Sequence, residues 1–301
     1  MSDTSPNQQL DRALYRGWLA MVLAIPLVAH AVGALVAWRF GLRTSAFIVG
    51  ASVGAVGALA SLVVASSKAV RKALSRAAPI VAAVCVGALF ATLLAPGRDD
   101  VHRWLPLGPF SLHVSAALSP WILWAASTLL ARRDALAYAA FALLFAAQGA
   151  HYLQPDTAQS WALAAGASML LYASRIIAPI RYGTIAIMAA FALATSMRPT
   201  SLEPVPEVEG VLSLAESLGS GWWVGAVLCV AGFPFVLGRW APSRLQSPTV
   251  HALAAYAGAI ALSSFTGDYP VPWLGAGAGH MLGAYAMVAL SLTKMRSDAV
   301  G

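Results

Sequence analysis

Apolar segments about 20 residues long recur along almost the whole sequence, and they constrain the fold more than any other feature. A bilayer core about 30 Å thick requires roughly 20 mostly apolar residues for each helical crossing. The 301-residue chain is 59% hydrophobic and only 10% charged, and its mean hydropathy of +0.72 is unusual for a soluble domain. The sequence therefore predicts an integral membrane protein that crosses the bilayer many times.

The predicted fold class is all-α, with about ten transmembrane helices. Backbone groups in lipid must be hydrogen-bonded within their own segment, and these apolar runs are too long and continuous for barrel strands. We predict tails at 1–16 and 294–301 and one membrane domain at 17–293, with its first span uncleaved. The ten predicted spans are 17–37, 45–66, 77–95, 112–130, 135–152, 158–174, 180–197, 220–238, 247–265 and 274–293.

The formal charge of +7 is distributed unevenly between the predicted loops. Loops rich in Lys and Arg resist translocation, so they predict the cytoplasmic side. We therefore expect both termini in the cytoplasm of an inner-membrane protein, and we read the charge as an orientation signal rather than a nucleic-acid footprint. The predicted cytoplasmic cations are Arg12, Arg16, Lys68, Arg71, Lys72, Arg76, Arg132, Arg133, Arg175, Arg181, Arg239, Arg244, Lys294 and Arg296. The predicted outer acids are Asp99, Asp100, Asp156, Glu203, Glu207, Glu209, Glu216 and Asp268.

Function is expected on the outer side, where the predicted loops are rich in Pro, Gly, Trp and charge. The spans hold almost no fixed charge, which argues against an ion-coupled transporter. Cys85 and Cys229 lack ligand spacing and read as buried apolar residues. The most acidic outer stretch is EPVPEVEGVLSLAE (203–216), with four glutamates.

Four of these segments, in order, resemble the SEDS family of bacterial cell-wall proteins, which includes FtsW, RodA and SpoVE. RWLPLGPFSLHVS (103–115) is similar to that family's RW…GPF…QPSE stretch, and LQPD (153–156) precedes a span of small residues. GVLSLAESLGSGWWVGAVL (210–228) is similar to the segment that leads into the eighth span, and PVPWLGAGAG (270–279) to the family's P-x-P-F motif. The resemblance extends from about residue 80 to the end.

The chain departs from the family pattern at several positions. The family's QPSE reads His113, Val114, Ser115 and Ala116, so its acid is missing, and the lysine that follows is Ser119. The terminal SxGG reads Gly275, Ala276, Gly277 and Ala278, and the family's essential aspartate falls on Val208.

The resemblance implies a peptidoglycan glycosyltransferase of cell division or elongation that polymerises glycan strands from lipid-linked disaccharide on the outer leaflet. It also implies a class B penicillin-binding protein as partner, beside the surrounding membrane lipid. The transfer needs a base for the acceptor hydroxyl and positive charge for the departing diphosphate. No cofactor or fixed metal site is expected, although a divalent cation is compatible with such a reaction.

The candidate catalytic residues are Glu209 and Glu207, the neighbours of Val208. Crowded like charges raise one another's pKa, which suits a general base. Glu209 is favoured because it lies nearer the helical segment that follows. The alternative interpretation of both residues is a solvated acidic loop.

The candidate substrate-binding residues are Arg103, Trp104, Arg198, Gln154 and Asp156. Arginine forks suit phosphate oxygens, but Trp104 and Arg103 also suit an interfacial belt and a headgroup anchor. Asp156 is predicted to cap the helix after it, and with Gln154 it borders the expected outer cavity.

Glycine and histidine positions in the last two spans carry structural predictions. Gly275, Gly279 and Gly283 are predicted to share one helix face and allow close packing. His251 and His280 read as isolated histidines without a second metal ligand. Glu216 is predicted to begin the eighth helix, where its charge suits the helix dipole.

Two other functions stay open. The lost acid, the lost lysine and Val208 suggest a degenerate paralogue that binds a transpeptidase or lipid-linked precursor without polymerising it. A flippase for lipid-linked precursor fits the ten spans, but the missing intramembrane charges argue against it.

Overall fold

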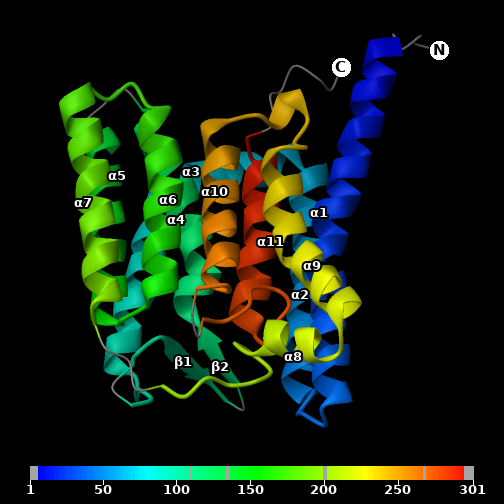
Figure 1. Ribbon diagram of the computed structural model, residues 1–301. Helices are drawn as coiled ribbons and strands as arrows, with labels where there is room; N and C mark the ends of the chain where they lie inside the picture. Colours follow the sequence, from blue (N-terminus) through cyan, green and yellow to red (C-terminus); the bar gives the residue numbers. More distant parts are fainter. Residues whose placement is uncertain are drawn as a thin grey trace.

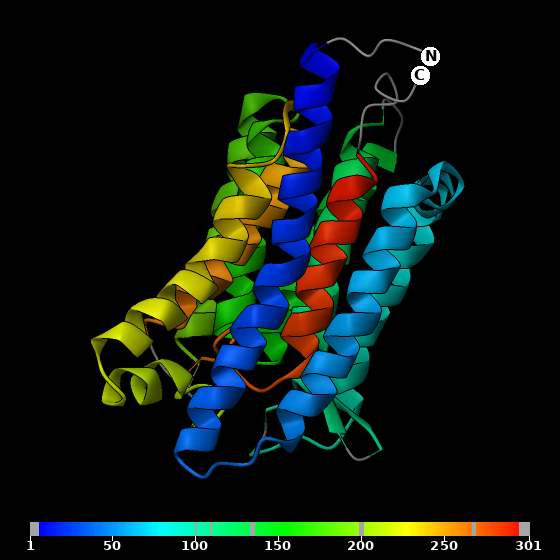
Figure 2. The ribbon, with the colours of Figure 1, turned by 90° about the vertical axis from the view of Figure 1, so that its right-hand side faces the viewer.

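The protein forms a bundle of long, roughly parallel helices with one small β-hairpin (Figures 1 and 2). The computed structural model describes residues 6–99, 101–108, 110–132, 136–198, 202–266 and 269–294. The helices are α1 (Pro6–Arg39), α2 (Ser45–Ser66), α3 (Lys68–Ala91), α4 (Val114–Leu130), α5 (Leu136–Leu153), α6 (Thr157–Tyr172), α7 (Ala178–Ser196), α8 (Val211–Ser217), α9 (Ser220–Gly238), α10 (Pro248–Ser263) and α11 (Ala278–Leu292). Two 3-10 turns, η1 (Thr92–Leu94) and η2 (Ser243–Leu245), and the strands β1 (Trp104–Leu107) and β2 (Phe110–His113) complete the described elements.

Ten of these helices coincide with the ten predicted spans, and the all-α membrane fold is confirmed. Six of the described helices are long and apolar enough to cross a bilayer by themselves: α1, α2, α3, α5, α7 and α9. The other four have 15 to 17 residues. The short helix α8 is additional.

The helices extend past the predicted spans where polar residues can continue a helix outside lipid. α1 begins at Pro6, within the predicted tail, and α3 begins at Lys68 rather than 77. The Ser67 hydroxyl caps α3 by accepting a hydrogen bond from the Val70 amide at 3.3 Å, as serine does at many helix starts. Apolar length therefore located the membrane segments but not the ends of the helices.

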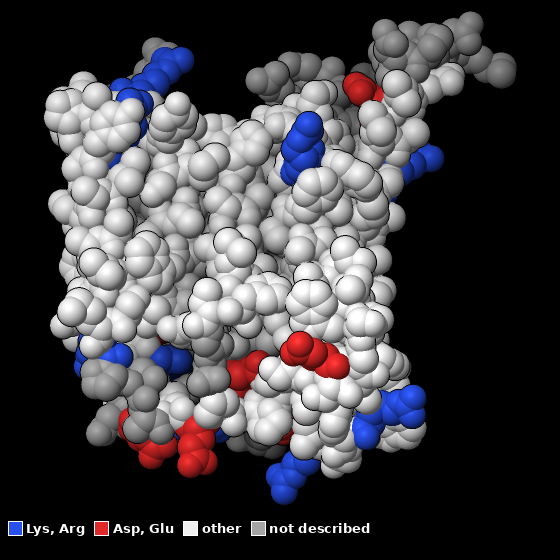
Figure 3. All heavy atoms as spheres, in the orientation of Figure 1, with Lys and Arg blue, Asp and Glu red and all other residues white. Residues whose placement is uncertain are grey.

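The bundle has two chemically different ends. We call the end where α1 begins and α11 ends the terminal end, and the opposite end, which carries β1 and β2, the hairpin end (Figure 1). Figure 3 shows most of the acidic side chains of one face at the hairpin end. Among the described residues, the predicted cytoplasmic cations lie at the terminal end. The predicted outer acids lie at the hairpin end. Asp100, Arg133, Asp268 and Arg296 lie outside the described residues, and the cytoplasmic assignment of the terminal end stays a prediction.

Helix α11 is the most buried helix and packs against α2 and α4. Small residues permit these contacts. A Cβ at Gly283 would lie 2.2 Å from the Ala116 carbonyl oxygen of α4, and one at Gly57 would lie 2.7 Å from the Tyr285 Cβ. Large apolar side chains are exposed instead on the outer helices, including Ile48, Ile80 and Leu228, as expected for surfaces that face lipid.

The predicted glycine face is confirmed at two of its three positions. Gly279 and Gly283 lie on α11 against α4, but Gly275 precedes the helix, which begins at Ala278. Gly275 instead allows a close approach between two loops at the hairpin end. Glu216 was also misplaced, because α8 ends at Ser217 and the left-handed Gly219 (φ of 122°) separates it from α9. Glu216 therefore lies at the end of a short helix rather than at the start of the eighth span.

Candidate functional site

The hairpin end brings together the loop segments that carry the SEDS-like motifs. The Val208 carbonyl accepts a hydrogen bond from the Val271 amide at 3.0 Å, and the Glu207 carbonyl accepts one from the Ala276 amide at 2.8 Å. A Cβ at Gly275 would lie 2.4 Å from the Val208 oxygen, so only glycine permits this approach. The acidic loop and the segment before α11 are thus joined along their backbones.

The two candidate catalytic glutamates have different surroundings. Val208 packs into a small apolar cluster with Ala37, Phe47 and Ala276. The Glu209 carboxylate Oε2 accepts a hydrogen bond from the Val205 amide at 2.8 Å, whereas the Glu207 side chain has no hydrogen bond within the described chain. Glu207 is therefore fixed mainly through its carbonyl, and Glu209 through its carboxylate.

The pKa of Glu209 is raised, and burial is the main cause. Hydrogen bonds from the Val205 and Glu209 amides and the nearby His113 and Arg103 side chains act in the opposite direction, but they do not cancel the burial effect. The carboxylate is thus within electrostatic reach of Arg103 and His113. A raised pKa was predicted, but from crowded like charges, whereas the structure assigns it to burial.

Arg103 and Arg198 both bind the loop that joins α5 to α6. Arg103 donates hydrogen bonds to the carbonyls of Gln154, at 3.2 Å, and Pro155. Arg198 donates to the carbonyls of Tyr152 and Leu153, the latter at 3.2 Å, and its guanidinium lies over the Tyr152 ring. Four successive carbonyls at the end of α5 therefore accept hydrogen bonds from arginine.

These bonds satisfy carbonyls that have no partner inside α5, at the end where the helix dipole is negative. They leave part of each guanidinium unused, because arginine has five N–H donors. A role for Arg103 and Arg198 in diphosphate binding stays a prediction.

Asp156 caps α6, as predicted. Its Oδ1 accepts a hydrogen bond from the Gln159 amide at 3.5 Å, and its Oδ2 forms an ion-pair contact with His113 Nε2 at 3.3 Å. Burial would raise the pKa of Asp156, but His113, by charge and hydrogen bonding, and then the charge of Arg103 outweigh burial and hold that pKa well below its usual range. Asp156 is 2% exposed, so the lowered pKa favours the ionised carboxylate despite its burial.

Gln154 is fully buried beside Asp156, and its carboxamide is hydrogen-bonded on both sides. Nε2 donates to the Leu89 carbonyl and to Thr92 Oγ1, each at 2.7 Å, and Oε1 accepts from Ser115 Oγ at 3.0 Å. These bonds join the ends of α3, α4 and α5. Substrate contact by Gln154 and Asp156 stays a prediction.

Sequence reasoning missed two histidines that complete this site. The His113 ring lies 5.8 Å from the Trp104 ring and stacks on His280, with 5.6 Å between centroids and 13° between planes. The prediction of an isolated His280 is therefore wrong, because α11 brings it under the hairpin. We call Arg103, His113, Gln154, Asp156 and His280 the buried polar cluster. The available signal was the presence of histidines in apolar spans, since such residues are rarely kept without a role.

Further polar groups continue from this cluster into the bundle. His151 Nε2 lies 3.5 Å from Ser119 Oγ, and Tyr256 donates to Gln159 Oε1. His151 Nδ1 and Gln159 Nε2 are buried without a hydrogen-bond partner. His251, by contrast, contacts Gln246 Oε1 at 2.9 Å near the terminal end. Within the described chain, no group of three or more His, Cys, Asp or Glu residues is arranged to hold a metal ion.

Comparison with known proteins gives matches only at the level of structure. No protein-family model and no curated protein matches the sequence. Two crystal structures of the rod shape determining protein RodA from Thermus thermophilus, one of a mutant, superpose with TM-scores of 0.65 and 0.64, each at 16% identity. The superposition covers 92% of this chain and 95% of each RodA chain. The chain has the RodA fold.

A further structure with the RodA fold comes from a peptidoglycan synthase complex that coordinates polymerization and crosslinking. It matches at a TM-score of 0.62 and 17% identity, over 92% of this chain and 96% of that chain. The SEDS resemblance of the four motif segments is therefore confirmed as a likeness of fold.

Proposed function

We propose that this protein is a membrane glycosyltransferase of the SEDS type, which polymerises peptidoglycan glycan strands from a lipid-linked disaccharide at its hairpin end. The observation that carries the proposal is Glu209, a partly buried carboxylate with a raised pKa beside the buried polar cluster of a RodA-like bundle. A base with such a pKa is better matched to a neutral working pH than an ordinary glutamate.

The proposed step is a single displacement. The Glu209 carboxylate accepts the proton of an acceptor sugar hydroxyl, and the hydroxyl oxygen forms a bond to the anomeric carbon of the donor. The bond between that carbon and the diphosphate oxygen breaks, and the lipid diphosphate leaves with its electron pair. One displacement inverts the configuration at the sugar carbon.

Arg103 and Arg198 are the proposed cationic contacts of the leaving diphosphate. Each guanidinium is already fixed by carbonyls of the 152–155 loop, so little conformational entropy is lost when its remaining N–H groups bind phosphate oxygens. The Trp104 ring lies 5.8 Å from the His113 ring, and the Arg98 guanidinium lies over it, 5.5 Å from its centroid. A sugar that stacks on Trp104 must share the ring with Arg98 or displace it.

Specific observations favour a second candidate, a non-catalytic paralogue that binds lipid-linked precursor or a transpeptidase. Val208 stands where the family has its essential aspartate and is packed among apolar side chains. Ala116 replaces the family's other acid and is buried. Glu209 also already accepts a hydrogen bond from its own loop.

Reconstitution into liposomes with labelled lipid-linked disaccharide tests these functions. Wild type, Glu209→Gln and the matched control Glu207→Gln are assayed with and without a class B penicillin-binding protein. We expect polymer from wild type, about a 100-fold or larger loss in Glu209→Gln, and a loss below about fivefold in Glu207→Gln.

The alternatives give different outcomes in the same assay. Binding of the precursor without polymer in wild type supports the non-catalytic paralogue. Movement of the lipid across the bilayer without polymer supports a flippase, and equal losses in both glutamate variants remove Glu209 from the proposed mechanism.

A further inference from the structure

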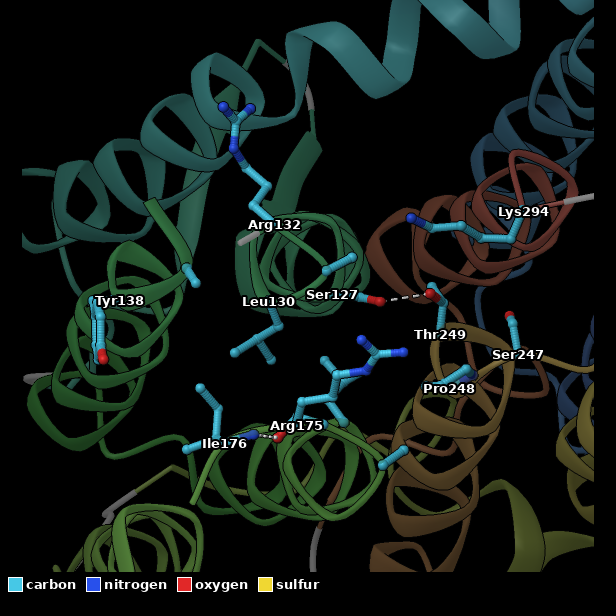
Figure 4. Close-up of a pocket in the computed structure, with 15 residues that line it drawn as sticks. Ser127, Leu130, Arg132, Tyr138, Arg175, Ile176, Ser247, Pro248, Thr249 and Lys294 are labelled. Atoms are coloured by element: carbon cyan, nitrogen blue, oxygen red, sulfur yellow. Dashed lines mark hydrogen bonds between the residues drawn. The ribbon is translucent and has the colours of Figure 1, made fainter. Parts of the chain in front are cut away.

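The terminal end contains a cavity that the proposed glycosyl transfer does not use. It has a volume of about 680 Å³ and lies between the ends of α4, α5, α6, α10 and α11 (Figure 4). This is the opposite end of the bundle from Glu209 and the buried polar cluster, so a ligand here does not belong to the proposed active site.

Two cations that face the cavity or its edge carry the charge of this site. The Arg175 guanidinium points from the α6–α7 connection toward the start of α10 in Figure 4, and it has no hydrogen-bond or ion-pair partner within the described residues. Lys294 follows α11, and its Nζ donates one hydrogen bond to Thr128 Oγ1 at 3.0 Å, which leaves two N–H groups free. Arg132 also borders the cavity, but its guanidinium points away from the centre.

Burial lowers the pKa of Lys294. A nearby anion would favour the ammonium form and offset this effect. The cation and an anionic ligand would therefore stabilise each other in the cavity.

The rest of the wall also favours an anion with an apolar part. The Ser127 and Thr249 hydroxyls lie 2.6 Å apart, and the start of α10 presents the positive end of its helix dipole. The lining residues include no Asp or Glu within the described chain, and Leu130, Leu170 and Ile176 supply apolar surface.

We propose that this cavity binds the phosphate group of an anionic membrane lipid, with Arg175 and Lys294 as its cationic contacts. The cavity lies at the ends of membrane-spanning helices, at the depth of the lipid headgroups. Its volume is in the range of sites for drug-sized molecules. A free phosphate would not fill it, whereas the apolar wall suits the upper part of an acyl chain. Basic pockets between transmembrane helices bind anionic headgroups in this way.

The test compares lipid binding by wild type and a double variant, Arg175→Gln with Lys294→Gln. Arg76→Gln with Lys72→Gln is the matched control, because it removes the same two charges from exposed positions at the terminal end outside the cavity. Purified full-length protein is titrated with phosphatidylglycerol, phosphatidylcholine or inorganic phosphate, and dissociation constants are obtained from native mass spectrometry and from the shift in melting temperature.

Wild type is expected to bind phosphatidylglycerol in preference to phosphatidylcholine, and the double variant to bind it about 10- to 30-fold more weakly. The control pair should change the constant by less than about threefold. If loss of the Lys294 hydrogen bond to Thr128 impairs folding of the double variant, Arg175→Gln alone serves as the test variant. We expect it to bind phosphatidylglycerol about fivefold more weakly than wild type. Equal losses in the double variant and control pair, or equal protection by inorganic phosphate and phosphatidylglycerol, would overturn the proposal.

Discussion

The candidate site at the hairpin end and the cavity at the terminal end use arginine in opposite ways. At the hairpin end, Arg103 and Arg198 bind four successive carbonyls, the last two of α5 and the first two after it. At the terminal end, the Arg175 guanidinium extends into a cavity without a partner in the described chain. Charge at the candidate site therefore stabilises the local backbone, whereas Arg175 in the cavity remains available for a ligand. Outside the cavity, the terminal end also uses arginine on carbonyls, because Arg71 donates to those of Val64 and Ala65 at 2.9 and 2.7 Å.

The largest expected effect is at Asp156, where charge is buried. Asp156→Ala removes the α6 cap and leaves His113 and Arg103 without their carboxylate, so we expect a loss of about 3–5 kcal/mol in the free energy of unfolding. Asp156→Asn keeps a capping oxygen and should recover about 1 kcal/mol of this loss. Thermal melting in detergent measures both, and the exposed Glu203→Gln should stay within about 0.5 kcal/mol of wild type.

The pH dependence of the Asp156 effect has a definite sign. Its pKa is lowered in the folded protein, so its charge contributes stability above its unfolded pKa of about 4 and loses that contribution as pH falls below it. The difference between wild type and Asp156→Asn should therefore shrink in acid. A difference that stays constant from pH 5 down to pH 2 would contradict the lowered pKa of Asp156.

The packing of α11 against α4 depends on the absence of a side chain at Gly283. Gly283→Ala places a Cβ against the Ala116 carbonyl, and we expect a loss of about 1–3 kcal/mol. Gly258→Ala is the control, because open space surrounds Gly258 on α10 and alanine favours a helix. Melting temperatures of the two variants should move in opposite directions, and a stable Gly283→Ala would show that the two helices can separate.

Arg198 and Arg175 differ in whether their guanidinium groups bind the backbone, and their alanine variants should differ accordingly. Arg198→Ala removes hydrogen bonds to the Tyr152 and Leu153 carbonyls and should cost about 1 kcal/mol. Arg175→Ala should leave stability within about 0.5 kcal/mol in lipid-free detergent. Chemical denaturation measures the free energy of unfolding of both variants. Equal losses in Arg198→Ala and Arg175→Ala would mean that the two arginines have the same structural role.

The smallest expected effect is a gain in stability from Glu209→Gln. The pKa of Glu209 is raised by burial, so its ionisation opposes folding as pH rises above its unfolded value of about 4.3. Because the side chain is partly exposed, we expect a gain of about 0.5 kcal/mol or less at pH 7. The melting temperatures of wild type and Glu209→Gln should converge near pH 4, whereas a lower melting temperature of the variant at pH 7 would show that the carboxylate is structural.

The sequence predicted features that depend on neighbouring residues along the chain. Apolar length located all ten spans, and the aspartate before α6 indicated its cap. It did not predict the β1–β2 hairpin, because the GPF segment was read as an irregular loop, and it placed Gly275 on a helix. Gly275 instead approaches Val208, a contact across 67 positions that no local pattern specifies.

Long-range pairing also explains which parts of the site were missed. His113 and His280 are separated by more than half of the chain, and only the packing of α11 against α4 and β2 stacks their rings. Arg103 and Arg198 were selected for their charge, but the carbonyls that they bind belong to a third segment. Residue type identified the candidates, whereas their partners depended on the assembled bundle.

The backbone pairing of the acidic loop also has a mechanical consequence. The partner segment carries Trp273, whose indole donates to the Cys229 carbonyl in α9 at 3.1 Å and whose carbonyl lies 3.3 Å from His30 Nδ1 in α1. A shift of the acidic loop would therefore strain the contacts of Trp273 with both helices. The loop, α1 and α9 are linked through this one tryptophan, and α1 and α9 are also joined directly by the hydrogen bond from Trp18 Nε1 to the Val236 carbonyl at 2.9 Å.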